Sequence, residues 1–179
     1  MGYTMNASAP QPAQPPATKP ITASRRYPGA PLGGVGIAVF NEAGEILLVQ
    51  RGRPPRVGTW GLPGGLIDLG ERLVDASMRE VMEEVGITIE VGDLVTTYES
   101  IHLDEQGQIE YHYVVLEYWA RYLDGDAVAQ DDAAAVAWVD YANLDAYALT
   151  PEQLDVLYKA HAAWQSATSP HSNMATSSS

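Results

Sequence analysis

Two apolar runs near the start of the chain predict a pair of neighbouring strands. Residues 35–40 and 46–50 are rich in Val, Ile and Leu, and the polar stretch 41–45 separates them. A short polar stretch containing Asn and Gly between two such runs is typical of a hairpin turn. A third short run at residues 134–139 predicts one further strand.

The clearest strand pattern lies at residues 110–121. Tyr and Val residues alternate there with residues that are themselves mostly apolar. Because successive side chains of a strand point to opposite faces, both faces are apolar or aromatic, and this strand is predicted to lie in the centre of a sheet. Residues 87–101 carry β-branched and aromatic side chains as well, and Gly92-Asp93 interrupts them.

A helical period follows the first strands. Val74, Met78, Val81 and Val85 recur at offsets of i, i+4, i+7 and i+11. This spacing predicts one apolar stripe along a helix. Gly86 follows the last of these residues and is predicted to cap the helix, because that position needs a backbone with positive φ.

A second helix is predicted near the end of the chain. Thr150, Pro151 and Gln153 are typical of the N-cap, the first helical residue and the third, and together they form a capping box. The apolar face of this helix is predicted to contain Leu154, Leu157, Tyr158, His161 and Trp164.

These elements together predict an α/β fold, a mixed β-sheet with helices on both faces in an α/β/α sandwich. Residues 25–165 form the folded domain in this interpretation. Residues 1–24 are rich in Ala, Pro, Gln and Thr, and residues 166–179 are mostly Ser, Thr and Ala. Because such segments bury little apolar surface, they are predicted to be a disordered arm and tail.

The candidate chemistry lies on the first predicted helix. Glu80, Glu83 and Glu84 stand at i, i+3 and i+4, so they share one face, predicted to lie opposite the apolar stripe. Crowded carboxylates repel each other unless a cation lies among them, so the group suits a hard divalent ion such as Mg²⁺. For these residues alone, the alternative is a solvated acidic face with Arg79 and Glu83 as a surface ion pair.

A wider pattern of fixed offsets favours the metal site. The fixed positions are Gly65, Glu71, Arg79, Glu80, Glu83, Glu84, Gly86 and Ile87. This pattern matches the signature of the Nudix hydrolases at every fixed position, and the chain resembles that family over residues 25–159. The resemblance is to the bacterial ADP-ribose pyrophosphatase-like branch, and it implies the same α/β/α fold.

The resemblance also implies a reaction. Family members hydrolyse the pyrophosphate bond of a nucleoside diphosphate linked to another group, X, with Mg²⁺ or Mn²⁺ as cofactor. The implied metal ligands are Glu80, Glu83, Glu84 and the backbone carbonyl of Gly65. Arg79 is expected to hold Glu80 or Glu71 in position, because its planar fork suits a carboxylate. Glu71 is then a structural residue or an outer ligand.

The base that deprotonates the attacking water is expected to be a glutamate of the signature. Glu80 or Glu83 is the first choice. An acid of a distant loop, Asp131 or Asp132, is the alternative, although paired acids in loops are often only solvated. A Glu→Gln series measured by turnover separates these choices.

Three arginines are candidate contacts to the phosphates of the substrate. Arg51, Arg53 and Arg56 cluster in a turn-rich stretch before the glutamate helix. A guanidinium binds phosphate through two parallel hydrogen bonds. The alternative is an ordinary surface cluster of basic residues.

The net charge of −13 narrows the class of partner. Such a surface repels the nucleic-acid backbone, so no nucleic-acid partner is expected, and a cation is needed to bridge the site and an anionic substrate. The chain has no cysteine, which excludes disulfides and thiolate sites and fits a cytoplasmic protein. No apolar run approaches a membrane span and the start lacks a secretory pattern, so no membrane partner is expected.

The group X is the least determined part of the prediction. The resemblance favours ADP-ribose or a related nucleoside diphosphate sugar, but a proline found after the signature in many ADP-ribose-cleaving members is replaced here by a stretch through His102 and Leu103. A nucleoside triphosphate pyrophosphohydrolase, including one for oxidised nucleotides, is the alternative. A non-catalytic nucleotide-sensing domain is a third class, and a homodimer is compatible with the resemblance.

Overall fold

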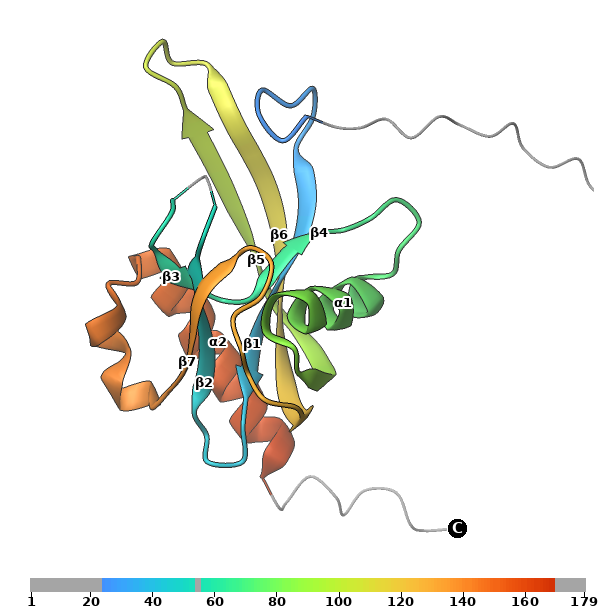
Figure 1. Ribbon diagram of the computed structural model, residues 1–179, viewed down its shortest axis with the longest axis vertical. Coiled ribbons are helices and arrows are strands. Elements are labelled where there is room, and N and C mark those ends of the chain that lie inside the picture. Colours follow the sequence, from blue (N-terminus) through green and yellow to red (C-terminus); the bar gives the residue numbers. More distant parts are fainter. Residues whose placement is uncertain (1–23, 54–55, 170–179) are drawn as a thin grey trace, which may run out of the picture.

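A mixed sheet with one helix packed on each face makes up the described part of the chain (Figure 1). The structure is a computed structural model, and it describes residues 24–53 and 56–169. The predicted arm therefore lies outside the described residues except for its last position. The elements are β1 Leu32–Phe40, β2 Ile46–Arg51, β3 Trp60–Gly61, β4 Gly64–Leu66, α1 Leu73–Val85, β5 Thr88–Leu103, β6 Ile109–Asp124, β7 Ala133–Val139, the 3₁₀ helix Tyr141–Tyr147 and α2 Pro151–Thr168.

The strand order is β3-β2-β1-β6-β5, with β4 paired to β1 and β7 paired to β2. β1 and β6 run parallel, from Leu32 opposite Tyr113 to Phe40 opposite Arg121. The other pairs are antiparallel, so the sheet is mixed. β6 lies between β1 and β5, which confirms the central strand predicted from its two apolar faces.

The sequence predicts an interruption at Gly92-Asp93, but the structure has a bulge there, within the long hairpin of β5 and β6. β5 runs through these residues without ending, and its register against β6 shifts between Val91 and Leu94. A Cβ at Gly92 would overlap the indole ring of Trp119. The glycine therefore makes room for a large side chain of the neighbouring strand instead of ending the strand.

Alternation along the first two strands builds two separate apolar cores. Val35, Ile37 and Val39 of β1 point to the face covered by α1, and Ala38 and Phe40 point to the face covered by α2. Because every residue of this run is buried on one face or the other, the run has no polar positions. This arrangement confirms the predicted α/β/α layers.

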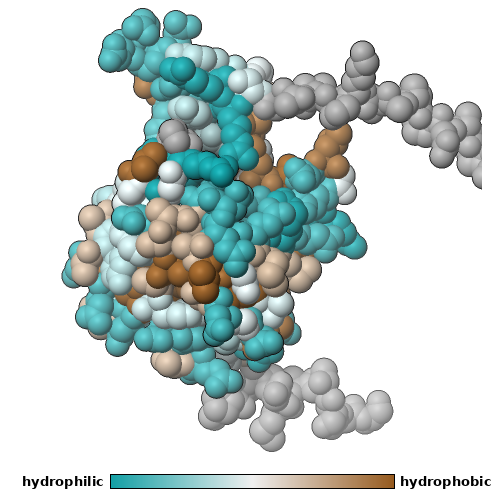
Figure 2. Space-filling view, viewed as in Figure 1, coloured by the Kyte–Doolittle hydropathy of each residue, from teal (hydrophilic) through white to brown (hydrophobic). Residues whose placement is uncertain are grey.

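The buried stripe of α1 differs from the predicted one. Val81 and Val85 are fully buried as expected, but Val74 and Met78 are 44% and 41% exposed. The inward residues at the start of the helix are instead Ala76 and Ser77, with Leu73 packed against the core. The surface over α1 is mainly hydrophilic in the space-filling view (Figure 2).

This rotation corrects the predicted position of the carboxylates. At ~100° per residue, Glu80 and Glu84 lie beside the stripe formed by Ser77, Val81 and Val85, rather than opposite it. The side chain of Glu80 is 14% exposed. Gly86 ends the helix with φ 73°, and its N–H donates to the carbonyl of Met82, so the predicted cap is confirmed.

The capping box of α2 is present as predicted. The hydroxyl of Thr150 accepts from the N–H of Gln153, and the side chain of Gln153 accepts from the N–H of Thr150. Tyr158 is half exposed, so its predicted place on the apolar face is wrong. The helix runs to Thr168, inside the predicted tail, whose residues from 170 onward lie outside the described residues. None of the helices described is long and apolar enough to cross a membrane.

Candidate active site

Two glycines of β4 let the carboxylates of α1 lie directly against the backbone. The N–H of Gly64 donates to Oε2 of Glu84 at 2.9 Å. Gly64 has φ 151°, and a Cβ there would overlap the carbonyl of Val35. A Cβ at Gly65 would overlap the carboxyl group of Glu80. Any larger residue at either position would push the glutamates away from this wall.

The carbonyl of Gly65 already belongs to the sheet. Gly65 pairs with Val35, and hydrogen bonds join the flanking pairs, from Ile37 to Pro63 and from Ile67 to Gly33. Because hydrogen-bonded pairs recur at every second residue of an antiparallel ladder, the Gly65 carbonyl accepts from the Val35 N–H. Its role as a metal ligand stays a prediction.

Arg79 binds three of the signature glutamates at once. It donates to Glu71 from Nε at 2.8 Å and from Nη2 at 2.7 Å, and its Nη1 donates to Glu80 at 2.8 Å and to Glu83 at 3.2 Å. Nη2 also donates to the carbonyl of Leu66 at 3.0 Å. The guanidinium therefore ties the loop before α1 and the end of β4 to the helix.

The pKa values of these acids are shifted in different directions. Hydrogen bonds from Arg79, and then from the backbone N–H of Asp68, lower the pKa of Glu71 to about 2. Burial raises the pKa of Glu84 to about 7, although the Gly64 N–H opposes this shift. Burial also raises the pKa of Glu80 in spite of Arg79. Burial thus favours the neutral form of these two carboxyl groups, whereas a bound cation would favour the charged form.

The side-chain oxygens of this site are suitable ligands for a hard divalent cation. The side chains on the wall are carboxylates, the oxygen ligands that Mg²⁺ and Mn²⁺ prefer, and two of them are partly buried. Among the described residues, however, no group of three acids or histidines is gathered closely enough to hold an ion as it stands. Two of the candidate ligands, Glu80 and Glu83, are engaged with Arg79 instead.

The pairing of β2 with β7 brings the predicted arginines and loop acids together. Arg51 pairs with Ala133, and the N–H of Gly52 donates to the carbonyl of Asp132. Arg53 forms ion pairs with Asp131 at 3.3 Å and with Asp132 at 2.5 Å. This contact, between residues about eighty positions apart in the sequence, was not predicted.

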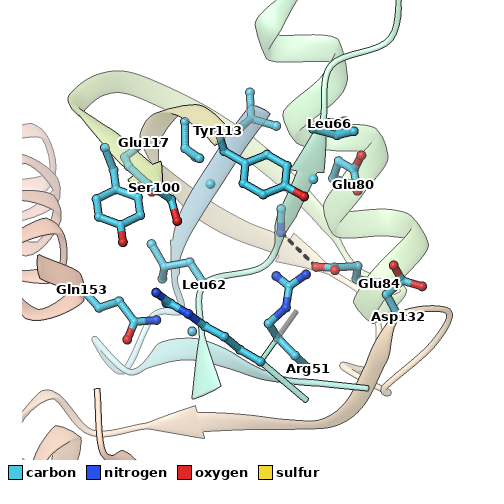
Figure 3. Close-up of a pocket in the computed structure, with 18 of the residues that line it drawn as sticks. Arg51, Leu62, Leu66, Glu80, Glu84, Ser100, Tyr113, Glu117, Asp132 and Gln153 are labelled. Carbon is cyan, nitrogen blue, oxygen red and sulfur yellow. Dashed lines mark hydrogen bonds between the residues drawn. The ribbon is translucent and has the colours of Figure 1, made fainter. Parts of the chain in front are cut away.

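A cavity of about 420 Å³ lies between these groups. Glu80, Glu84 and Asp132 lie on the side of the cavity near α1, and the side chain of Arg51 extends toward Glu84 (Figure 3). Arg56, Glu83 and Asp131 also line it. The structure thus brings most of the predicted site residues to one cavity. Arg53 instead forms ion pairs with the two loop acids, and Glu71 forms an ion pair with Arg79.

The opposite side of the cavity contains residues that were not predicted as site residues. Trp60 and Tyr98 line the cavity, and the ring of Trp60 also packs edge-on against that of Tyr147, with 5.1 Å between the ring centroids. Ser100, Glu117 and Gln153 line the same side. An acid inside an otherwise apolar and aromatic strand was the available signal for Glu117.

Comparison with known families shows which family the chain belongs to. A model described as the NUDIX domain matches residues 31–160, which is most of the chain. The chain belongs to the Nudix family.

Relatives of this Nudix chain carry different names. It is 30% identical over 116 residues to an ADP-ribose pyrophosphatase of Methanocaldococcus jannaschii, covering 65% of this chain and 66% of that protein. It is 42% identical over 66 residues to the mouse 8-oxo-dGDP phosphatase NUDT18, covering 36% of this chain and 20% of that one. The matches thus span less than two thirds of these relatives' own length.

A solved structure resembles the Nudix fold described above. The NUDIX domain of Shewanella oneidensis NrtR, in complex with ADP ribose, is 25% identical with a TM-score of 0.59. The match covers 82% of this chain and 93% of that chain.

Proposed function

We propose that this Nudix protein hydrolyses the pyrophosphate bond of a nucleoside diphosphate linked to X, with ADP-ribose or a related nucleoside diphosphate sugar as substrate. The observation that carries the proposal is the carboxylate wall on α1, which lies against Gly64 and Gly65 and faces a cavity of about 420 Å³. A site that binds a charged diphosphate needs carboxylates for a bridging cation and a cavity large enough for the rest of the molecule.

The proposed metal ligands are Glu80, Glu83, Glu84 and the carbonyl of Gly65. A bound Mg²⁺ or Mn²⁺ would neutralise the diphosphate and lower the pKa of water. Arg79 positions the ligands: its bonds to Glu71 fix the guanidinium, and the same guanidinium orients Glu80 and Glu83.

The proposed bond changes are those of a hydrolysis. Glu80 or Glu83 takes one proton from the attacking water, and the water oxygen bonds to a phosphorus of the diphosphate. The bond from that phosphorus to the bridging oxygen breaks, which leaves a nucleoside monophosphate and a sugar phosphate. Asp131 or Asp132 is the alternative base, and both line the cavity.

Arg51 and Arg56 are the proposed contacts to the phosphates. Both line the cavity, and the side chain of Arg51 extends toward Glu84, close to the proposed metal ligands (Figure 3). Arg53 is the third predicted contact, but its ion pairs with Asp131 and Asp132 favour a role in holding that loop.

The choice of ADP-ribose rests on the resemblance to two proteins. One carries the name ADP-ribose pyrophosphatase, and the other holds ADP ribose in its solved structure. The alternative is a nucleoside triphosphate pyrophosphohydrolase, including one for oxidised nucleotides, and the short match to an 8-oxo-dGDP phosphatase supports only the oxidised nucleotide. A nucleotide-sensing domain without turnover is the remaining alternative.

A substrate panel tests this proposal. Purified protein is assayed for release of nucleoside monophosphate from ADP-ribose, other nucleoside diphosphate sugars, dinucleotides and triphosphates, each with Mg²⁺, with Mn²⁺ and with EDTA. The expected result is metal-dependent turnover that is fastest on ADP-ribose or another nucleoside diphosphate sugar. Faster turnover of an oxidised triphosphate would favour the alternative enzyme, and binding without turnover on every compound would favour the sensor.

A further inference from the structure

Glu117 is a buried acid that the proposed chemistry does not use. It lies on the central strand β6 and is 7% exposed, and its Oε2 has no hydrogen-bond partner among the described residues. Burying a carboxyl group without a partner is unfavourable, so such groups in proteins usually serve a ligand or a mechanism.

The neighbouring strand is built to accept this carboxyl group. Gly36 of β1 stands opposite Glu117 in the parallel ladder, and a Cβ at Gly36 would overlap both carboxyl oxygens or approach them closely. The side chain therefore lies over the backbone of β1, in space that only a glycine leaves open.

Glu117 lies apart from the carboxylate wall on α1. It lines the side of the cavity that carries Ser100 and Gln153, away from Glu80 and Glu84 on α1 (Figure 3). Burial raises its pKa to about 7, and no charged group among the described residues contributes to this shift. The carboxyl group is therefore mainly neutral below pH 7, and the neutral form has one O–H donor and one acceptor oxygen.

The surroundings of Glu117 suit a flat, partly apolar ligand. Trp60, Leu62 and Val115 line the cavity together with Tyr98. A nucleobase combines flat apolar faces with a polar edge. Its faces would pack against these side chains, and its edge would form hydrogen bonds with Glu117.

We propose that Glu117 binds the edge of the adenine base of the substrate. Its O–H donates to a ring nitrogen of adenine, and its carbonyl oxygen accepts from the exocyclic amino group. A sugar phosphate without a base offers neither of these groups and cannot form this contact. The inference rests on the proposed function for the position of the diphosphate, and it adds the residue that holds the base.

Binding of two monophosphates tests the inference without turnover. The affinities of AMP and ribose 5-phosphate are measured by calorimetry with Mg²⁺ on the full chain and on the variants Glu117→Gln and Glu117→Ala. Because the two ligands share the ribose phosphate, the difference between their affinities reports on the base. Glu99→Gln, on the exposed face of the same hairpin, is the matched control.

We expect the unaltered chain to bind AMP about tenfold more tightly than ribose 5-phosphate. Glu117→Gln keeps this preference, because an amide also offers one donor and one acceptor, and Glu117→Ala loses it. Equal affinity for AMP and ribose 5-phosphate in the unaltered chain, an unchanged preference in Glu117→Ala, or an equal loss of affinity for both ligands in that variant would each overturn the inference. Thermal unfolding of each variant shows that it is folded, and Glu117→Leu, which fills the same space without a polar group, replaces Glu117→Ala if that variant is unfolded.

The two proposals fail separately. A chain that prefers AMP and loses the preference in Glu117→Ala, but does not hydrolyse ADP-ribose, contradicts the proposed reaction and keeps the base contact. A chain that hydrolyses ADP-ribose with no effect of Glu117→Ala on AMP binding does the reverse.

Discussion

Arg79 holds Glu71 through two parallel hydrogen bonds, from Nε to Oε1 at 2.8 Å and from Nη2 to Oε2 at 2.7 Å. The same guanidinium also binds Glu80 and Glu83. Glu71 is thus linked to the proposed metal ligands only through Arg79. This arrangement explains why an arginine rather than a lysine stands here, since an ammonium group cannot form the same planar fork.

Arg79→Lys is expected to lower kcat/KM about 10- to 100-fold, which is the usual cost of losing a group that orients metal ligands. The half-maximal Mg²⁺ concentration should rise in the same variant, because Glu80 and Glu83 are no longer held in position. Titration of activity with Mg²⁺ checks both effects. Asp155→Asn, which breaks the exposed ion pair with Lys159, is the control and should change neither value.

Glu80→Gln or Glu83→Gln is expected to lower kcat by about 10²- to 10⁴-fold if the altered residue is the base for the attacking water. The measurement is turnover at saturating substrate and Mg²⁺. Glu99→Gln removes an exposed carboxylate of the hairpin and should leave kcat unchanged. Unaltered kcat in both variants would contradict this assignment and direct attention to Asp131 and Asp132.

Glu117 is expected to make the metal-free protein less stable as the pH rises from about 5 to 8. Burial raises its pKa from 4.5 to about 7, so between these values the folded protein keeps a proton that the unfolded chain has lost. Stability then falls with rising pH, because the unfolded state binds fewer protons.

Thermal unfolding in EDTA across this pH range checks the effect of Glu117. The slope of the unfolding temperature against pH should be smaller in Glu117→Gln, since an amide does not titrate. A slope identical to that of the unaltered chain would show that this carboxyl group does not contribute.

Gly36→Ala is expected to lower the free energy of unfolding by about 1–3 kcal/mol, because the added methyl group overlaps the carboxyl group of Glu117. The double variant Gly36→Ala with Glu117→Ala should recover part of this loss, since the overlapping group is gone. Denaturant unfolding of the two single variants and the double variant measures their coupling. Strictly additive effects would mean that the two residues do not contact each other in this way.

A divalent cation is expected to stabilise the folded chain. Mg²⁺ at about a hundred times its Kd should add about 2.7 kcal/mol to the free energy of unfolding, because it binds the folded state. Glu84→Gln should reduce this gain, since an amide is a weaker ligand than a carboxylate. The unfolding temperature with Mg²⁺ and with EDTA is the measurement, and an equal gain in both proteins would exclude Glu84 as a ligand.

Local features of the chain were predictable from the sequence. The Gly86 cap and the Thr150 capping box depend on residues within one helical turn, so their signals stand side by side in the sequence. The central place of β6 was predictable as well, because a strand with two apolar faces has to be covered on both.

The rotation of α1 was not predictable in the same way. Val74 and Met78 continue the apolar period, yet they are exposed, and Ser77 is buried in their place. A hydrophobic period shows that a helix has an apolar side, but the sheet against which it packs decides which residues are covered. For this reason Glu80 and Glu84 are half-buried beside the core rather than exposed on the far side.

The sequence by itself determined the long strands, the two α-helices, the caps at Gly86 and Thr150 and the set of acids on one helix, because these follow from interactions between residues close together in the chain. The tertiary structure alone decided that Glu117 faces the cavity from β6 and that Arg53 meets Asp131. These relationships depend on which strands pair, as Gly36 pairs with Glu117 across eighty-one positions. Strand pairing is decided by the packing of the whole sheet, and no local pattern records it.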